Sequence, residues 1–363
     1  MLPTTMTAAV LYGPGDLRVE TRPVPPVDLN DVAINVAFCG ICGTDLHYWD
    51  GWTFDAWLPN YDQPWVMGHE FTGTVEAVGE AVDAFAVGDR VVVEPKTPCH
   101  TCALCRKGLL NFCTGTRGLT RGGAWAEYTV VDHRNVVPVP DGLDASLVAL
   151  TEPLGCVLRG FDRIHVSAGD SIFVAGAGPI GLMAVQLAKH TGAARVLVSE
   201  PHASRRKLVE TLGADAIFDP MTDDVPAAVR DLTRGLGADI CIEAAGANPA
   251  FQACIDSARD SGTILVLSLA NPTVTFDLRP YDLFSHELRI VGSNTRLNTF
   301  ERALDLVPRL DLKPIVTEVL PLGQAEAAVR RAKAGEGGKI VLDCSFGSTA
   351  QLLPSTPITG SCH

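Results

Sequence analysis

Four cysteines lie close together in the order Cys99-x2-Cys102-x2-Cys105-x7-Cys113. A structural zinc ion takes four tetrahedral ligands, and such short spacings let one loop wrap the ion. Four protein ligands leave no open coordination position, so a site of this kind stabilises the fold and does no chemistry. Burial of four free cysteines is the alternative, but the loop also carries polar residues such as Arg106 and Lys107. The loop therefore predicts a structural zinc site.

Three other segments, well separated in the sequence, carry residues of the types that bind a catalytic metal: Cys42, His69 with Glu70, and Glu152. A catalytic zinc keeps three protein ligands and an open position for water or substrate. Taken singly, each residue has an ordinary structural explanation, such as a small buried residue or a carboxylate in the first turn of a helix. Cys156, one helical turn beyond Glu152, is a rival thiolate ligand. Together these residues predict a second, catalytic metal site.

A glycine-rich turn follows an apolar stretch and precedes a helical pattern. Its residues are Gly176, Ala177, Gly178, Pro179, Ile180 and Gly181. In such a turn the first glycine permits the tight bend, the second lets the backbone approach a pyrophosphate, and the third lets helix and strand pack closely. The strand–helix context makes this a prediction of a dinucleotide site.

The residues after the next strand bear on the choice of dinucleotide. Glu200 ends the segment Val198-Ser199-Glu200, where a carboxylate accepts hydrogen bonds from the adenosine ribose and repels a 2′-phosphate. NAD is therefore expected rather than NADP. Arg205 and Arg206, one turn into the following helix, could instead bind a phosphate, or form a solvated helix face. Arg205 is retained as a candidate cofactor-binding residue.

The elements that must position these residues fall into two patterns. The first 150 residues read as short strands between turns, with helical character only near Ser146 to Arg163. From Ser171 strands and helices alternate, which predicts a parallel sheet with helices on both faces. The expected strands are 171–175, 195–199, 217–218, 240–244, 263–267 and 290–292. After residue 299 a helix and two strands are too short to form a domain, and we expect them to return to the first one.

The chain has 363 residues and a formal net charge of −13 at pH 7. This acidic balance argues against nucleic acid or an anionic membrane surface as a partner. The first ten residues show no secretory signal, and the glycines in the apolar stretch 171–188 argue against a membrane span. We expect a cytoplasmic protein in which the 11 cysteines bind metal or are buried. The tail after Ser345 is expected to cover the surface or to be disordered.

In this order the motifs resemble those of the zinc-containing medium-chain alcohol dehydrogenase family. The resemblance extends to Leu342 and includes the cysteine loop, the glycine turn, Gly68-His69-Glu70, Gly88-Asp89-Arg90-Val91 and Glu152-Pro153-Leu154. Within the family, the sorbitol, 2,3-butanediol and threonine dehydrogenase branch is the most similar. The resemblance implies an α/β fold. A GroES-like, β-rich catalytic domain would comprise residues 1–157 and 297–363, and a Rossmann domain with a doubly wound parallel sheet would comprise residues 158–296.

The resemblance also implies roles for individual residues. In the sorbitol enzymes, ligands matching Cys42, His69 and Glu70 hold the catalytic zinc with a water. The residue matching Glu152 lies beside that water and becomes a ligand in related branches. Thr44 and His47 match the positions that pass the proton towards solvent.

The expected substrate pocket departs from that of the sorbitol enzymes. Tyr48 matches a pocket tyrosine, but their pocket arginine aligns with Thr295, and the adjacent Arg296 could replace it. Their Phe-Tyr pair is Glu127-Tyr128 here, which argues against sorbitol itself. Seven aromatic residues between Cys42 and His69 could wall a pocket or pack the loop on itself: Tyr48, Trp49, Trp52, Phe54, Trp57, Tyr61 and Trp65.

The resemblance implies a zinc-dependent oxidoreductase that transfers hydride between NAD(H) and a secondary alcohol, vicinal diol or polyol. It implies two zinc ions per subunit, one catalytic and one structural, and a homotetramer or homodimer. One alternative is an NADP-dependent biosynthetic reductase or cyclitol dehydrogenase of the same family. Another is a non-catalytic, zinc-stabilised binding protein, which predicts damaged catalytic positions, whereas all the candidate positions above are intact.

Overall fold

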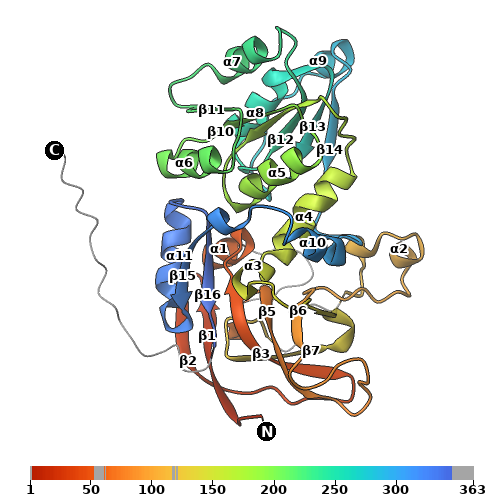
Figure 1. The fold of residues 1–363 in the computed structure, drawn as a ribbon, viewed down its shortest axis with the longest axis vertical. Coiled ribbons are helices and arrows are strands. Elements are labelled where there is room, and N and C mark those ends of the chain that lie inside the picture. Colours follow the sequence, from red (N-terminus) through yellow and green to blue (C-terminus); the bar gives the residue numbers. More distant parts are fainter. Residues whose placement is uncertain (1, 53–60, 62, 117–118, 120–121, 346–363) are drawn as a thin grey trace, which may run out of the picture.

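The computed structural model describes all residues except 1, 53–60, 62, 117–118, 120–121 and 346–363. The described chain forms two halves, and α4 and α10 lie where the halves meet (Figure 1). Phe54, Trp57 and the C-terminal tail, for which the sequence carries expectations, lie outside the described residues.

The first half is built on two sheets among the described residues. One has seven strands in the order β15-β16-β3-β5-β6-β8, with β7 paired to β3, and the other has the order β2-β1-β4. Apart from the parallel pair β15 and β16, neighbouring strands in both sheets are antiparallel. The strands are β1 (Thr5–Gly13), β2 (Asp16–Pro23), β3 (Asp31–Gly40), β4 (Trp65–Val66), β5 (Glu70–Val78), β6 (Arg90–Val93), β7 (Tyr128–Asp132), β8 (Val136–Pro138), β15 (Val316–Pro321) and β16 (Lys339–Asp343).

The C-terminal strands return to the first half of the chain, as expected. β16 pairs antiparallel with β3, so that Val341 lies opposite Gly40 and Leu342 opposite Cys39. On the other side of β3, Gly40 lies opposite Glu70 at the start of β5. Residues from three distant parts of the sequence are thereby placed side by side.

The second half contains a six-stranded, all-parallel sheet in the order β11-β10-β9-β12-β13-β14. Its central strand β9 is buried along its whole length, as expected for a parallel sheet covered on both faces. The predicted strand–helix alternation is confirmed. The strands are β9 (Ser171–Ala175), β10 (Arg195–Ser199), β11 (Ala216–Phe218), β12 (Ala238–Glu243), β13 (Ala258–Val266) and β14 (Arg289–Gly292).

The helices of the second half pack on this sheet, and others close the first half. They are α1 (Gly43–Trp49), α2 (Ala103–Arg106), α3 (Ala145–Val148), α4 (Thr151–Asp162), α5 (Pro179–His190), α6 (Ala203–Thr211), α7 (Val225–Leu232), α8 (Asn248–Ser257), α9 (Pro280–Ser285), α10 (Phe300–Leu306) and α11 (Ala325–Ala334). Short 3-10 turns are η1 (Leu110–Phe112), η2 (His133–Asn135), η3 (Lys313–Ile315) and η4 (Leu322–Gln324).

The expectation that the first half is helical only near 146–163 is wrong for two short helices, α1 and α2. α1 has only seven residues, too few for a clear helical period, and depends on a capping box between Cys42 and Asp45. α2 has four residues within the cysteine loop.

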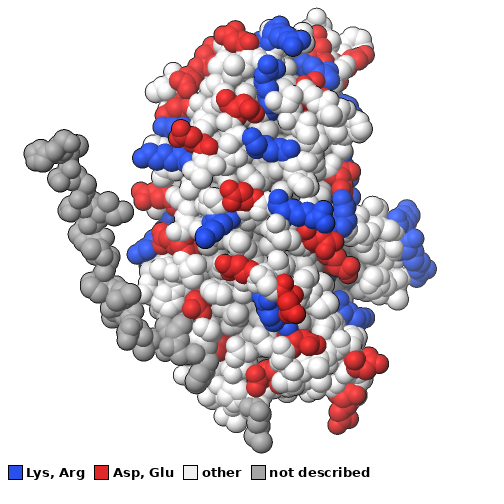
Figure 2. Space-filling model, viewed as in Figure 1, with Lys and Arg blue, Asp and Glu red and all other residues white. Residues whose placement is uncertain are grey.

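The two largest hydrophobic clusters of the described residues are separate, and α4 belongs to the second of them. One joins the first-half strands to β16 and α11, and the other joins α4, α10 and the parallel sheet. α4 runs unbroken across residue 157, and the domain limits stay a prediction. Among the described helices, none has the length and apolar character to cross a membrane. Acidic and basic side chains are interspersed over the face shown in Figure 2.

Candidate metal centres and cofactor site

The four-cysteine loop brings its sulfur atoms together around one point. The Sγ atoms of Cys99 and Cys105 are 4.0 Å apart, and those of Cys102 and Cys113 are 3.9 Å apart. Tetrahedral zinc with bonds of about 2.3 Å places its sulfur ligands about 3.8 Å from each other. The loop therefore has the dimensions of a closed zinc site.

Backbone N–H groups also point at these sulfur atoms. Cys102 N donates to Cys99 Sγ at 3.3 Å, and Cys105 N donates to Cys102 Sγ at 3.4 Å. Hydrogen bonds from the Thr101 hydroxyl and from backbone N–H groups lower the pKa of Cys99 to about 5. Backbone hydrogen bonds lower the pKa of Cys102 to about 7, whereas burial raises that of Cys105 to about 12. Thiolates are the form that binds zinc, so the loop favours the metal-binding state at two positions.

A second group consists of Cys42, His69 and Glu70, whose ligand atoms all lie within 4.8 Å of one another. Asp45 ties two of them in place, because its Oδ2 accepts a hydrogen bond from Cys42 N at 2.9 Å and its Oδ1 lies 3.4 Å from His69 Nδ1. With Nδ1 facing a carboxylate, Nε2 is the nitrogen left for a metal. Burial lowers the pKa of His69, but the charges of Asp45 and Cys42 outweigh burial and raise it. The site thus favours positive charge where zinc would bind.

Glu70 is fully buried and forms an ion pair with Lys339, which is 2% exposed. The Lys339 side chain reaches Glu70 across Gly40, where an added Cβ would overlap the Glu70 carboxylate. Only glycine leaves room for the pair at this point of β3. Burial alone would lower the pKa of Lys339, but the charges of Glu70 and Cys42 outweigh it and raise the pKa. Lys339 therefore stays charged beside the metal group.

Glu152 lies in the first turn of α4, outside this three-residue group. It is buried and forms an ion pair with Arg296, whose Nη1 also donates to Cys156 Sγ at 3.4 Å. Arg296 itself is 7% exposed. Burial raises the pKa of the Cys156 thiol, which disfavours the thiolate form needed for a rival ligand. A role for Glu152 as an exchanging ligand stays a prediction.

α1 follows Cys42 directly and contains the residues expected to relay the proton, Thr44 and His47, and the expected pocket residue Tyr48. Thr44 is half-buried, and the His47 ring stacks on Trp52 with centroids 3.9 Å apart. Tyr48 is buried and lines a small cavity that His69 also borders. Of the described aromatic residues in this stretch, Tyr48 and Trp49 belong to the hydrophobic core, and Tyr61 and Trp65 pack against it.

Glu127 and Tyr128, which replace the Phe-Tyr pair of the sorbitol enzymes, are engaged elsewhere. Glu127 Oε2 accepts a hydrogen bond from Thr7 N at 2.7 Å. Tyr128 packs with Met6, Ala8 and Val10. Both residues thereby fasten β1 to its neighbours.

The glycine turn joins β9 to α5 in the arrangement expected for a dinucleotide site. Gly176 has a φ of +102°, a left-handed conformation that favours glycine. A Cβ at Gly181 would overlap the carbonyl of Gly176, so the first turn of α5 can approach only without a side chain there. Gly178 is the N-cap of α5, and Pro179 and Ile180 begin the helix. The N-terminus of this helix, with its positive dipole end, suits a pyrophosphate.

Glu200 lies at the end of β10 with its carboxylate turned towards the glycine turn. Its Oε2 accepts a hydrogen bond from Ala177 N at 2.7 Å, and its Oε1 accepts one from His202 N at 2.9 Å. The two arginines of α6, Arg205 and Arg206, make specific contacts and do not simply form a solvated helix face. Arg205 Nε donates to Gly337 O at 2.9 Å, linking the two halves, and Arg206 is held by the Glu200 carbonyl and by Asp219.

The geometry accords with known proteins of similar sequence and fold. Residues 28–141 match the alcohol dehydrogenase GroES-like domain, and residues 179–309 match the zinc-binding dehydrogenase domain. Sorbitol dehydrogenase from Bacillus subtilis (strain 168) is 32% identical over 91% of this chain and 94% of its own length. The chain belongs to the zinc-containing medium-chain alcohol dehydrogenase family.

Other members of the family are similarly related. L-threonine 3-dehydrogenase from Rhizobium johnstonii is 32% identical over 90% of this chain and 95% of its own length. A solved structure described as a zinc-binding dehydrogenase from Sinorhizobium meliloti 1021, bound to NADP, is 31% identical with a TM-score of 0.88. It covers 94% of this chain and 100% of its own. As a family member, this chain is a zinc-dependent dehydrogenase.

Three residues of the site are not apparent from sequence patterns alone. Asp45 could have been noticed as the third residue after Cys42, in the position of a capping-box carboxylate. Lys339 has no local signal, because its partner Glu70 lies on a strand two positions away in the sheet. Glu94, whose Oε1 lies 3.6 Å from Arg296 Nε, has none either.

Proposed function

We propose that this dehydrogenase uses NAD to oxidise a secondary alcohol, vicinal diol or polyol at Cys42, His69 and Glu70. The observation that carries the proposal is the convergence of these three ligand atoms within 4.8 Å of one another. The named relatives act on sorbitol and on threonine, which share a secondary hydroxyl beside another polar group. The four-cysteine loop, with no open position, would hold the structural zinc.

When bound, the zinc ion supplies Lewis acidity that lowers the pKa of an alcohol hydroxyl, and NAD supplies the hydride acceptor. The Thr44 hydroxyl receives the proton of the substrate hydroxyl and passes its own towards His47. Burial lowers the pKa of His47, against the charges of Asp50 and Asp45, so its ring is neutral near pH 7 and can accept that proton. Asp45 keeps Cys42 and His69 oriented throughout.

The assignment of NAD rests on Glu200, which is 2% exposed and fixed by two backbone hydrogen bonds. A fixed carboxylate at the end of β10 accepts from ribose hydroxyls and repels a 2′-phosphate. NADP is the second candidate, because a similar structure binds it and Arg205 lies beside the glycine turn.

The direct test follows NADH formation at 340 nm with a panel of diols, polyols, cyclitols and aromatic alcohols. Activity with a secondary alcohol that is lost in Cys42→Ser is the expected result. Loss of activity while the Cys99–Cys113 loop retains zinc identifies Cys42 with the catalytic metal. No oxidation of any alcohol by protein with two zinc ions per chain would contradict the proposal.

The cofactor is tested separately by comparing NAD and NADP in the parent chain and in Glu200→Ala. We expect the parent to prefer NAD and the variant to lose much of that preference. A parent chain that already prefers NADP would show that Glu200 does not select the cofactor. Arg205→Gln is the matched variant, and it should lower use of NADP more than use of NAD.

A further inference from the structure

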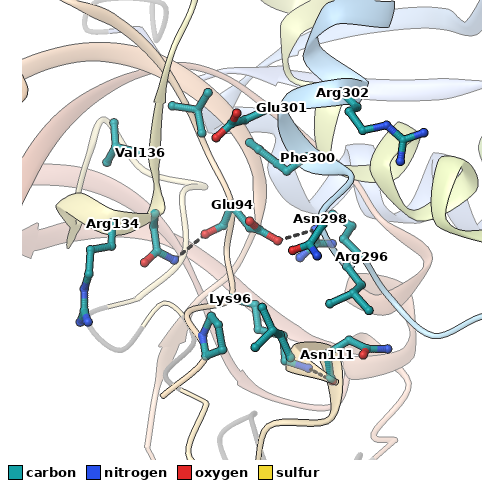
Figure 3. Close-up of a pocket in the computed structure, with 15 residues that line it drawn as sticks. Glu94, Lys96, Asn111, Arg134, Val136, Arg296, Asn298, Phe300, Glu301 and Arg302 are labelled. Atoms are coloured by element: carbon teal, nitrogen blue, oxygen red, sulfur yellow. Dashed lines mark hydrogen bonds and ion pairs between the residues drawn. The ribbon is translucent and has the colours of Figure 1, made fainter. Parts of the chain in front are cut away.

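A pocket of about 380 Å³ lies beside the metal centre, and the proposed mechanism makes no use of it. The end of β6, the η1 turn of the cysteine loop, β8 and the segment 296–302 surround it (Figure 3). We call it the β6–β8 pocket. Pro95 lines the small cavity beside His69, whereas its neighbours Glu94 and Lys96 line the β6–β8 pocket. The β6–β8 pocket is therefore a separate space, of a size that ligand sites have.

Two buried polar atoms on its wall have no hydrogen-bond partner among the described residues. One is Asn111 Oδ1, although Asn111 Nδ2 donates to Asn294 O at 3.1 Å. The other is Arg296 Nε, which makes no hydrogen bond but forms an ion pair with Glu94 Oε1 at 3.6 Å. Buried polar groups are nearly always hydrogen-bonded, so the acceptor Asn111 Oδ1 above all points to a polar molecule in the pocket. One atom accepts a hydrogen bond and the other donates one.

Charged side chains of both signs surround the pocket. The basic ones are Lys96, Arg134, Arg296 and Arg302, and the acidic ones are Glu94 and Glu301. The charges of all three arginines are already balanced, because Arg134 pairs with Asp132, Arg296 with Glu152 and Arg302 with Asp162. Lys96 Nζ donates to Asn111 O at 2.8 Å, and an ammonium group has two more N–H donors to offer.

This mixture favours a neutral hydroxylated ligand over a charged one. An anion in the pocket would face the carboxylates of Glu94 and Glu301, and a cation would face the ammonium group of Lys96. A hydroxyl group donates to one set and accepts from the other. Buried Phe300 and Val136 add an apolar wall suited to the C–H faces of a carbon chain.

We propose that the β6–β8 pocket binds a neutral polyhydroxylated molecule of the sugar-alcohol type at a site separate from the metal centre. Its hydroxyls donate to Glu94 and Asn111 Oδ1 and accept from Lys96 Nζ. Arg296 contacts both Glu94 and Glu152, so one side chain links the pocket to the first turn of α4. The inference goes beyond the proposed function, since it requires no reaction at zinc.

The test measures binding of sorbitol, gluconate and 1-amino-1-deoxysorbitol to the zinc-loaded chain by isothermal titration calorimetry. The three share a six-carbon hydroxylated chain and differ in the charge of one end. We expect sorbitol to bind at least about fivefold more tightly than either charged analogue, the equivalent of one hydrogen bond. Tighter binding of a charged analogue overturns the assigned ligand class.

Variants locate the binding site. Val137→Trp places a large side chain in the pocket and should abolish the sorbitol binding that persists in Cys42→Ser, whereas Val319→Trp, at a valine that is 48% exposed on β15, should not. Lys96→Met removes one donor at similar length and should weaken binding about fivefold. If Val137→Trp does not fold, Lys96→Met decides the question.

The same titration in Cys42→Ser separates this inference from the proposed function. Sorbitol binding that persists in Cys42→Ser and is lost in Val137→Trp supports a separate pocket. Binding that disappears in Cys42→Ser, or that neither pocket variant weakens, overturns it, as does a parent chain that binds no sorbitol. A chain that binds sorbitol but oxidises no alcohol contradicts the proposed function alone.

Discussion

Replacing Lys339 with methionine would leave the Glu70 carboxylate buried without its partner cation. The two side chains are 2% and 0% exposed, so water cannot replace the lost ammonium group. Removing one partner of such a buried pair costs about 3–5 kcal/mol of folding free energy. We expect a loss of that size in urea unfolding of the chain without zinc at Cys42, His69 and Glu70, followed by tryptophan fluorescence. Trp125 is a local reporter, because its Nε1 donates to Gly40 O at 3.3 Å.

Lys333→Met is the matched control, because Lys333 pairs with Asp50 at the surface with exposures of 37% and 39%. An exposed pair contributes about 0–1 kcal/mol, so this variant should unfold close to the parent. If Lys339→Met loses no more than Lys333→Met at an unchanged m-value, the buried pair does not stabilise the fold as argued. Adding Glu70→Gln to Lys339→Met should restore part of the loss, because the unpaired charge is removed.

The pH dependence follows from the raised pKa of Lys339. A group whose pKa is higher in the folded than in the unfolded chain stabilises the fold fully below the unfolded value, which is 10.5 for lysine. That stability is lost as the pH rises through the folded value. The stability difference between the parent and Lys339→Met should therefore be constant well below pH 10.5 and shrink above it. A difference that already shrinks near pH 7 would contradict the assignment.

Three further predictions test the other parts of the site. Cys102→Ser should lower the zinc content by about one ion per chain in metal analysis and reduce thermal stability, because the closed site loses one of four ligands; full zinc content would exclude it as a ligand. His47→Asn should slow alcohol oxidation about 100-fold or more, because the proton acceptor is lost. It should also remove the acid limb of the pH–rate profile, which reflects the His47 pKa that burial lowers below 6.5. An unchanged profile would exclude the relay. Gly181→Ala should raise the KM for NAD at unchanged zinc content, because its methyl group meets the Gly176 carbonyl; an unchanged KM would show that the turn tolerates a side chain.

Local patterns predicted much of the fold correctly. The parallel strands were recognisable because each is a short apolar run buried on both faces, as β9 is throughout. The four-cysteine loop and the glycine turn were recognisable because each is a single short segment of the sequence, Cys99 to Cys113 and Gly176 to Gly181. α1 was missed, since seven residues carry too little periodicity and its start depends on Asp45 capping Cys42.

What the sequence alone determined is therefore the chemistry of residues that act together locally: the thiolate loop, the glycine turn and the alternation of strands and helices. Only the tertiary structure decided how distant charges are balanced. Arg296 meets Glu152 although 144 residues separate them, and Lys339 meets Glu70 across Gly40. The physical reason is that a buried charge must find a partner wherever the fold brings one, and sequence spacing does not record which strands become neighbours.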